Sequence, residues 1–538
     1  MSSSGTIGKV GGATEVADQR LQNALARVTD NQAKPIEKYL ALRDLEEKDS
    51  SVFHKLLQQH TTEVLPFVYT PTVGEACQRY DELNIQTHGL YLTLNDTGKI
   101  LEKLQSWPRQ DIRVIVVTDG QRILGLGDLG TGGMGISEGK ILLYSAIGGV
   151  SPKQLLPICL DVGTNNENLI KNPKYRGSKK PRAVGREYDE FLREFMESVK
   201  KWRPHVFVQF EDFANHNAFV LLKKYRELYP CFNDDIQGTA TIGLAGILAA
   251  MRVSGEELKS QRFFFYGAGE AAAGIAQLLV MALHKWHGMS IPEARSRCIL
   301  YDSKGVVTKT RNDSGSLQPH KQDFAHEYSW EGGGSAEEPK TLFEAIRYLK
   351  PTVLIGSATQ PKAFTKEIVE LMSDLNERPV IFPLSNPTSK AECTFKEAFD
   401  WSKGKVVFAS GSPFPPINTA YGDGNGEEGS SRTIYPAQAN NAYIFPAVGH
   451  AAILTGAKSI PDDLLLDVAK SLASMSTKQD LESGLLFPPL RSIKDVSIKL
   501  IASLCKEICR RDLATETGIS DRTVEQWENI IRDNSFTG

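Results

Sequence analysis

The chain has 538 residues, of which 41% are hydrophobic and 24% are charged, and its formal net charge at pH 7 is −3. This length gives room for roughly two to four domains, each with its own hydrophobic core. The nearly neutral charge offers no basic surplus for nucleic acid or an anionic membrane, and no uninterrupted apolar stretch is long enough to span a bilayer.

The seven cysteines are scattered singly and form no CxxC pair, which indicates a reducing compartment rather than a disulfide framework or a zinc site. The N-terminal residues have neither the apolar core of a secretory signal nor an Arg-rich, acid-poor face. The sequence therefore predicts a cytoplasmic location, with the mitochondrion as the open alternative. The first dozen residues are small and polar and are expected to be disordered.

Residues from about 15 to 65 carry apolar side chains at helical spacing, which predicts a helical N-terminal region. Three apolar runs follow at 112–118, 156–162 and 205–210, and a helical pattern at 187–200 separates the last two. Strands that alternate with helices indicate a parallel α/β domain.

A second α/β unit is predicted to begin near residue 235, with strands at 262–266, 297–301, 352–356, 379–384 and 405–409. Residues after about 440 are expected to be mostly helical. Two inserts of low complexity, 329–338 and 419–431, are interpreted as solvated surface loops.

The predicted fold class is thus α/β, with four parts along the chain. These are a helical N-terminal domain at 1–90, a parallel-sheet domain at 91–234 plus 441–512, a Rossmann-like domain at 235–440, and a C-terminal tail at 513–538. The middle two parts would carry the ligands, because small molecules bind at the carboxyl ends of parallel strands.

Two glycine-rich stretches could bind a dinucleotide. The full GxGxxG pattern occurs at 125–130, but it runs on into TGGMG, where no helix can begin well, so it is interpreted as a loop. The second stretch, GAGEAAAG at 267–274, lies between an aromatic strand and a strong helix former and is the better candidate. Its expected cofactor-binding residues are Gly267, Ala268, Gly269, Glu270, Ala271 and Ala272.

The next strand ends in Asp302, where an acid that binds the adenosine ribose is expected, although the interval exceeds the usual spacing of about 20 residues. Ser303 and Lys304 follow directly, and Lys321 could add a second positive charge. A hydroxyl and an ammonium group would suit a 2′-phosphate, so NADP is predicted over NAD. Each lysine taken alone is more often a solvated surface residue.

Adjacent carboxylates follow two apolar runs, Glu211–Asp212 after VFVQF and Asp234–Asp235 after CFN. Neighbouring strand residues point to opposite faces, so Glu211 and Asp212 converge only if the strand has ended in a loop. Clustered carboxylate oxygens without nearby cationic residues favour a hard divalent cation, Mg²⁺ or Mn²⁺. A helix N-cap or a solvated loop cluster is the alternative, and spacing alone does not decide between them.

Several segments together resemble the malic enzyme family: VYTPTVG, VVTDGQRILGLGDLGTGGMGI, VQFEDF, FNDDIQGTA, GAGEAAAGIA, LSNPTSKAEC, FASGSPF and NNAYIFPAV. The likeness extends in order from about residue 35 to about residue 510. It implies oxidative decarboxylation of L-malate to pyruvate and CO₂ with a divalent metal and NADP⁺, decarboxylation of oxaloacetate, and a homo-oligomer, either a dimer or a tetramer.

The resemblance also implies roles for single residues. Lys140 resembles the family's general base and Tyr69 its general acid, with Asp234 beside Lys140. The expected metal ligands are Glu211, Asp212 and Asp235. The expected substrate contacts are Arg122, Asn386, Asn440 and Asn441, and Asn386 would also contact the cofactor. Alanines at 437, 439 and 447 replace glycines that are usual in relatives, which leaves open whether Asn440 or Asn441 contacts the substrate.

Two other classes of protein remain as alternatives. One is a metal-dependent decarboxylase or lyase that holds its nucleotide structurally and performs no net redox reaction. The other is a non-catalytic nucleotide-binding protein on an enzyme scaffold. Tyr69, Lys140 and the carboxylates argue against the second alternative, because a binding module needs none of them.

Overall fold

The computed structural model describes residues 10–328, 338–420 and 431–538. Residues 1–9 of the expected N-terminal disorder and most of the two predicted inserts lie outside the described residues. Residues 10–12, also expected to be disordered, instead begin helix α1 (Val10–Thr29), and the ends of the second insert belong to strands β12 (Ile417–Ala420) and β13 (Ser431–Ile434). The chain divides into two compact units, one of Met1–Val206 with Asn529–Gly538 and the other of Phe207–Glu528.

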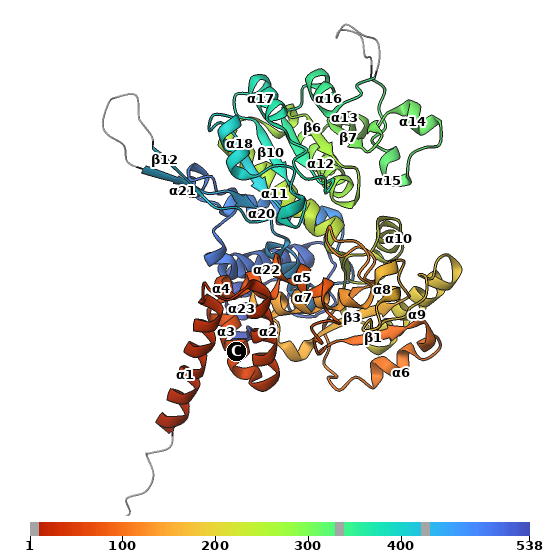
Figure 1. Cartoon of the computed structure of the whole chain (residues 1–538), viewed down its shortest axis with the longest axis vertical. Helices are drawn as coiled ribbons and strands as arrows, with labels where there is room; N and C mark the ends of the chain where they lie inside the picture. Colours follow the sequence, from red (N-terminus) through yellow and green to blue (C-terminus); the bar gives the residue numbers. More distant parts are fainter. Residues whose placement is uncertain (1–9, 329–337, 421–430) are drawn as a thin grey trace, which may run out of the picture. The chain divides into compact units, whose positions relative to one another are not determined.

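The first unit begins with helices, as the periodicity predicts (Figure 1). They are α1 (Val10–Thr29), α2 (Pro35–Lys48), α3 (Ser50–Gln59), α4 (Thr61–Val68) and α5 (Thr72–Gln78). Pro35 occupies the first turn of α2, where its missing N–H costs nothing. Asp49 ends α2, and its side chain accepts the N–H of Val52 at the start of α3, so one residue separates the two helices.

The strands of the first unit are parallel and lie in the order β1, β3, β2. Their bounds are β1 (Leu90–Thr93), β2 (Val114–Thr118) and β3 (Leu155–Asp161), and the helices among and after them are α6 (Ile100–Gln105), α7 (Met134–Ala146), α8 (Glu167–Lys171) and α9 (Arg186–Trp202). The predicted strands β2 and β3 are buried along their whole length, as is typical of parallel strands. Strand β1 was not predicted, because it is short and only partly buried.

The glycine-rich stretch after β2 is a loop over its first part, as predicted, but a helix does begin within it. A 3-10 helix at Gly130–Gly133 leads directly into α7. A Cβ on Gly132 would lie 2.6 Å from the carbonyl oxygen of Cys77, and one on Gly135 would lie 2.9 Å from its sulfur. The glycines therefore let α7 lie close to α5, and this packing outweighs their low helix propensity.

The second unit contains a seven-stranded sheet in the order β14, β11, β10, β9, β6, β7, β8, in which only β7 and β8 are antiparallel. All five predicted strands are present, as β6 (Phe263–Tyr266), β7 (Cys298–Asp302), β9 (Val353–Gly356), β10 (Val380–Pro383) and β11 (Val407–Ser410). The edge strands β8 (Gly305–Val306) and β14 (Ala437–Gln438) were not predicted, because each has only two residues. Order and direction are those of a Rossmann-like sheet.

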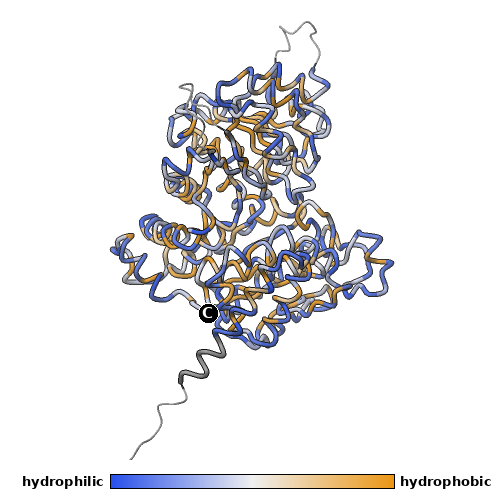
Figure 2. The backbone as a smooth tube through the Cα atoms, turned by 60° about the vertical axis from the view of Figure 1, so that its left-hand side comes forward, coloured by the Kyte–Doolittle hydropathy of each residue, from blue (hydrophilic) through white to orange (hydrophobic). Residues whose placement is uncertain are grey.

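Helices cover both faces of this sheet. On one face, α16 (Leu342–Leu349), α17 (Lys366–Leu375) and α18 (Phe395–Trp401) pack against alternate strand residues such as Phe264 and Leu354. On the other face, α11 (Thr239–Ser254) and α12 (Glu270–His287) lie together, and Gly246 of α11 admits the ring of Phe382. The apolar colour accordingly lies inside this part of the chain in Figure 2.

The remaining elements of the second unit include the parallel pair β4 (Phe207–Phe210) and β5 (Cys231–Asn233). Short elements are β12 (Ile417–Ala420), β13 (Ser431–Ile434), α10 (Asn215–Tyr225), α13 (Ile291–Ser296), α14 (Lys309–Asp313), α15 (Pro319–Gln322) and α21 (Lys478–Glu482). The C-terminal helices of this unit are α19 (Phe445–Thr455), α20 (Asp462–Met475) and α22 (Ile493–Arg510). The last helix, α23 (Val524–Asn534), begins in the second unit and ends in the first.

One segment, Asp234–Ser254, is long and apolar enough to cross a membrane, but 78% of its most apolar window is buried inside the structure. Such burial is typical of a core helix in a globular protein. All seven cysteines are free thiols, and all but the half-buried Cys509 are buried.

Candidate functional site

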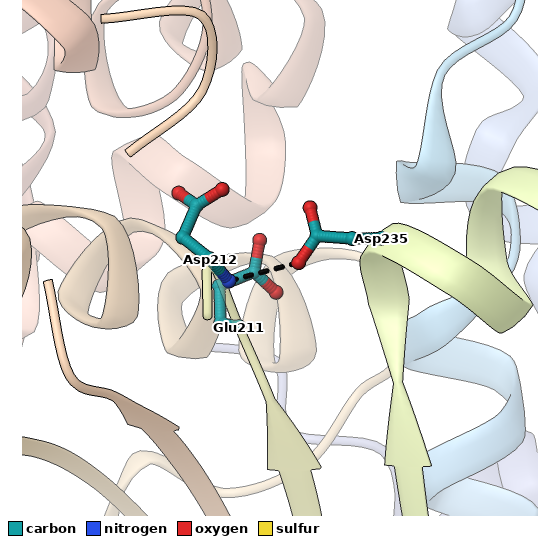
Figure 3. A group of neighbouring side chains, drawn as sticks. All are labelled: Glu211, Asp212 and Asp235. Atoms are coloured by element: carbon teal, nitrogen blue, oxygen red, sulfur yellow. Dashed lines mark hydrogen bonds between the residues drawn. The ribbon is translucent and has the colours of Figure 1, made fainter. Parts of the chain in front are cut away.

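Three carboxylates meet at the carboxyl ends of β4 and β5. Glu211 and Asp212 follow the last residue of β4, and Asp212 has a φ of +54°, so the strand has ended and the chain turns. Asp235 follows β5, and the parallel register of Phe210 with Asn233 brings the two strand ends together. The Asp212 N–H donates to Asp235 Oδ2 over 2.8 Å (Figure 3).

The group formed by Glu211, Asp212 and Asp235 has the donor chemistry of a metal site. One oxygen of each carboxylate lies within 4.8 Å of one oxygen of the other two. Glu211 and Asp212 are buried, and Asp235 is half-buried. Like charges this close destabilise one another unless a cation offsets them, and hard oxygen donors suit Mg²⁺ or Mn²⁺. The residues present therefore fit a hard divalent cation.

The adjacent acid, Asp234, has a different surrounding. It is buried, and Asn441 Nδ2 donates to its Oδ2 over 2.9 Å and to its backbone carbonyl over 3.2 Å. Gly238 permits this arrangement, because a Cβ there would lie 2.0 Å from Asp234 Oδ1. The two asparagines thus have separate tasks: Asn440 caps a 3-10 helix by accepting the Ala442 N–H, whereas Asn441 holds Asp234.

Asn386 lies in the loop that follows β10, next to the sheet edge where a ligand is expected. Its side-chain oxygen accepts a hydrogen bond of 2.7 Å from Ser412 Oγ. A Cβ on Gly411 would lie 2.9 Å from Asn386 Nδ2, so the loops after β10 and β11 are closely packed around this amide.

In the first unit the two residues predicted to transfer protons lie together. Lys140 is on α7 with only 2% of its surface exposed, and its Nζ is 5.2 Å from the centroid of the Tyr69 ring. Tyr69, also buried, is the residue that ends α4. A buried lysine is uncommon outside functional sites, and the π-face of the ring attracts the ammonium group.

Gly139 sets the separation of α7 from the chain that carries Tyr69. A Cβ at this position would lie 2.9 Å from the carbonyl oxygen of Val68. We expect Gly139→Ala to lower the free energy of unfolding by about 1–3 kcal/mol through overpacking and to impair turnover through displacement of Lys140. Thermal unfolding and steady-state kinetics measure both effects. Gly74→Ala, in the same unit, is the control, because the atom nearest to its Cβ would be a terminal methyl carbon of Leu126, at 3.2 Å.

Arg122 is half-buried in the loop after β2. A network of charged side chains that was not predicted from the sequence closes this loop. Arg182 donates to both oxygens of Asp128, over 2.8 and 2.9 Å, and lies 3.7 Å from buried Asp119. Tyr188 donates to Asp119 over 2.8 Å. Burial raises the pKa of the Asp119 carboxyl, although Arg182 and Tyr188 oppose this. The partners come from distant segments, so no local pattern indicates them.

The stretch GAGEAAAG forms the predicted turn between β6 and α12. Gly267 has a φ of +112°, and a Cβ there would lie 2.8 Å from the Ser357 backbone, so glycine is required. Gly269 precedes the first helical residue, Glu270, which is buried. Ala272 is also buried, in line with close packing of helix on strand. Backbone N–H groups at such a helix start suit a diphosphate.

Asp302 is the centre of a charged cluster at the end of β7. Its carboxylate accepts two bonds of 2.9 Å from Arg311 and one of 3.0 Å from Lys321, and the backbone N–H of exposed Lys304 donates to it over 2.9 Å. Burial opposes ionisation, but these donors hold the pKa of Asp302 below its usual range. Arg311 was missed by the sequence analysis. The two side-chain cations, Arg311 and Lys321, outnumber the single carboxylate and leave a net positive charge, and exposed Ser303 follows Asp302 directly.

Curated plant proteins are closely similar to the chain. A protein from Zea mays named "NADP-dependent malic enzyme, chloroplastic" is 48% identical over 498 residues, covering 92% of this chain and 75% of the relative. A Vitis vinifera "NADP-dependent malic enzyme" is 46% identical over 96% of this chain and 83% of the relative. Both relatives are thus named as malic enzymes that depend on NADP.

These comparisons contradict the cytoplasmic location expected from the N-terminus. The Zea mays protein and an Oryza sativa subsp. japonica relative, 48% identical over 89% of this chain and 72% of its own, are both named as chloroplastic. Cellular location depends on a targeting segment that a receptor recognises and not on the folded domains. The composition of the N-terminal residues is therefore a weak guide to location.

Solved structures and family models agree with the fold. The Entamoeba histolytica malic enzyme matches with a TM-score of 0.60 and 22% identity over 98% of this chain and 89% of that one, a likeness of fold alone. "Malic enzyme, N-terminal domain" matches residues 46–226, and "Malic enzyme, NAD binding domain" matches residues 236–509. The chain is therefore an enzyme of the malic enzyme family, α/β in fold with a Rossmann-like dinucleotide-binding domain.

Proposed function

We propose that the chain catalyses the oxidative decarboxylation of L-malate to pyruvate and CO₂ with NADP⁺ and a divalent metal ion. The observation that carries this proposal is the group of three carboxylates, because its chemistry matches a cation that binds a small hydroxy acid. Membership of the family and the NADP-dependent relatives support the reaction. Added oxaloacetate would be decarboxylated at the same residues.

Lys140 and Tyr69 are proposed to move the protons. Lys140 would take the proton from the malate C2 hydroxyl, and Tyr69 would donate a proton to the enol carbon after CO₂ has left. Their proximity, 5.2 Å between the ammonium nitrogen and the ring centroid, supports a shared task. Asp234, held by Asn441, is proposed as a third catalytic residue.

Glu211, Asp212 and Asp235 would hold Mg²⁺ or Mn²⁺, which when bound supplies the positive charge that polarises substrate oxygens. Arg122 would bind a malate carboxylate, since a guanidinium offers two parallel donors to it. The amides of Asn386, Asn440 and Asn441 would complete the binding of substrate.

The β6–α12 turn would hold NADP⁺, which when bound supplies the nicotinamide that takes up the C2 hydride. The turn residues 267–272 would hold the diphosphate. The cluster of Asp302, Arg311 and Lys321 would receive the adenosine ribose with its 2′-phosphate, together with Ser303 and Lys304. The charge balance of this cluster supports NADP over NAD, because paired Asp302 no longer presents an uncompensated negative charge to the phosphate.

The direct test is a nucleotide-reduction assay with malate, Mn²⁺ and NADP⁺. Formation of reduced nucleotide that requires all three components would support the proposal. If oxaloacetate is decarboxylated while malate reduces no nucleotide, the enzyme is a lyase that holds its nucleotide structurally. The proposal includes a homo-oligomer, a dimer or a tetramer, which light scattering of the purified chain measures.

Replacement of Lys321 tests the choice of nucleotide. In Lys321→Ala, Asp302 keeps Arg311 but loses its other side-chain cation, and a 2′-phosphate loses a charged partner. We expect KM for NADP⁺ to rise by about 10- to 100-fold, the value of a charge-assisted hydrogen bond, with little change for NAD⁺. Lys309→Ala, which removes an exposed ion pair to Glu327, is the control. Equal use of both nucleotides before and after the change would refute the role of Lys321.

A further inference from the structure

His320 joins three segments of the second unit. Its Nε2 lies 2.9 Å from the backbone carbonyl oxygen of Ala268, in the middle of the turn between β6 and α12. Its ring stacks flat on Phe219 of α10, with 4.7 Å between centroids and an angle of 12°. The next residue is Lys321, whose ammonium group reaches Asp302 over 3.0 Å.

The contact to Ala268 fixes a proton and a peptide orientation. A carbonyl oxygen only accepts, so Nε2 must carry the hydrogen in this bond. Burial lowers the pKa of His320, and the hydrogen bond to the Ala268 carbonyl opposes this with a smaller effect. The lowered pKa keeps the ring neutral near pH 7. Because a trans peptide points its C=O and N–H in opposite directions, holding the Ala268 carbonyl toward His320 directs the Gly269 N–H away from it.

The segment around His320 has few other fixed points. Helix α15 is only four residues long, Pro319–Gln322, too short to hold its own geometry. Buried Leu317 and Phe324 anchor its two sides, and the ion pair between Asp323 and Arg295 is partly exposed. The stack on Phe219 and the bond to Ala268 are the contacts that tie this segment directly to α10 and to the turn, next to Lys321.

We propose that His320 is a positioning residue for nucleotide specificity, which holds Lys321 in register with the phosphate-binding turn so that its ammonium group meets the 2′-phosphate. This proposal rests on the NADP⁺ preference proposed above. The Phe219 ring supplies a flat, apolar support for the imidazole, and the Ala268 carbonyl supplies the directional contact.

The test compares the affinities for 2′,5′-ADP and 5′-AMP, which differ in the 2′-phosphate, by calorimetry without malate or metal. In His320→Ala we expect the preference for 2′,5′-ADP to fall about tenfold, as for a weakened charge-assisted bond, while 5′-AMP binding changes little. His320→Gln, which can still donate to Ala268, should recover part of the preference. Asp323→Asn, on the same segment, is the matched control and should keep the full preference.

A double-mutant cycle separates positioning of Lys321 from a general loss of structure. In a Lys321→Ala background, His320→Ala should not lower the preference further, because both changes remove the same contact. Equal weakening of both ligands in His320→Ala, or a further loss of preference in the Lys321→Ala background, would overturn the proposal. A wild-type protein that binds 2′,5′-ADP and 5′-AMP equally would instead refute the NADP⁺ preference itself.

Discussion

Lys140→Ala is expected to lower kcat for malate oxidation by about 10²- to 10⁴-fold, the usual contribution of a positioned general base. Lys140 is buried on α7 beside Tyr69, so no solvent-exposed lysine takes its place. The measurement is the rate of nucleotide reduction at saturating malate, NADP⁺ and Mn²⁺. Addition of methylamine should restore part of the activity, because the vacated space next to Tyr69 can admit a small amine.

The control for this change is Lys153→Ala, an exposed lysine of the same unit, which should leave kcat unchanged. Thermal unfolding of both variants checks that the fold persists. A Lys140→Ala enzyme with wild-type turnover would remove Lys140 from the chemistry and leave the malate reaction without its proposed base.

Asp235→Asn is expected to weaken Mn²⁺ binding by about a hundredfold, the upper end of the 10- to 100-fold range typical of residues that only support metal ligands. Asn keeps an oxygen that can accept the Asp212 N–H, so the geometry of the turn should survive. Without metal, the variant should unfold at the same or a higher temperature than the wild type, because one of three repelling charges is gone.

With metal, the order of stability should reverse. At Mn²⁺ a hundredfold above Kd the wild type gains about 2.7 kcal/mol from binding, and the variant gains far less. Asp374→Asn, at an exposed acid on α17, is the control and should keep the full gain. Thermal unfolding of the wild type and both variants, with and without Mn²⁺, gives the six values needed. A full Mn²⁺-induced gain in Asp235→Asn would show that the ion binds elsewhere.

The sequence predicted the main strands and the convergence of the carboxylates because both follow from local rules. A buried parallel strand such as β2 is an apolar run, and residues directly after a strand, such as Glu211 and Asp212, lie at the ligand edge of the sheet. The same rules fail for β1 and β5, which are only a few residues long. They also fail for the glycines before α7, which allow this helix to pack closely against α5.

The residues that hold the site in place could not be predicted from one sequence. Arg182 reaches Asp128 across 54 positions, and His320 reaches Ala268 across 52. Such partners depend on the tertiary fold, and a histidine or arginine in a polar segment carries no local signal of them. Arg311 is only nine positions from Asp302, but the antiparallel return of β8 was not predicted, so its approach was missed.

The most direct measurement follows L-malate labelled with deuterium at C2 through a reaction with Mn²⁺ and NADP⁺. The account predicts that the deuterium appears in the reduced nucleotide and that CO₂ and pyruvate form in equal amounts with it, because one hydride leaves for each carboxyl group lost. Release of CO₂ with no label in the nucleotide, or label transfer with no CO₂, would contradict it.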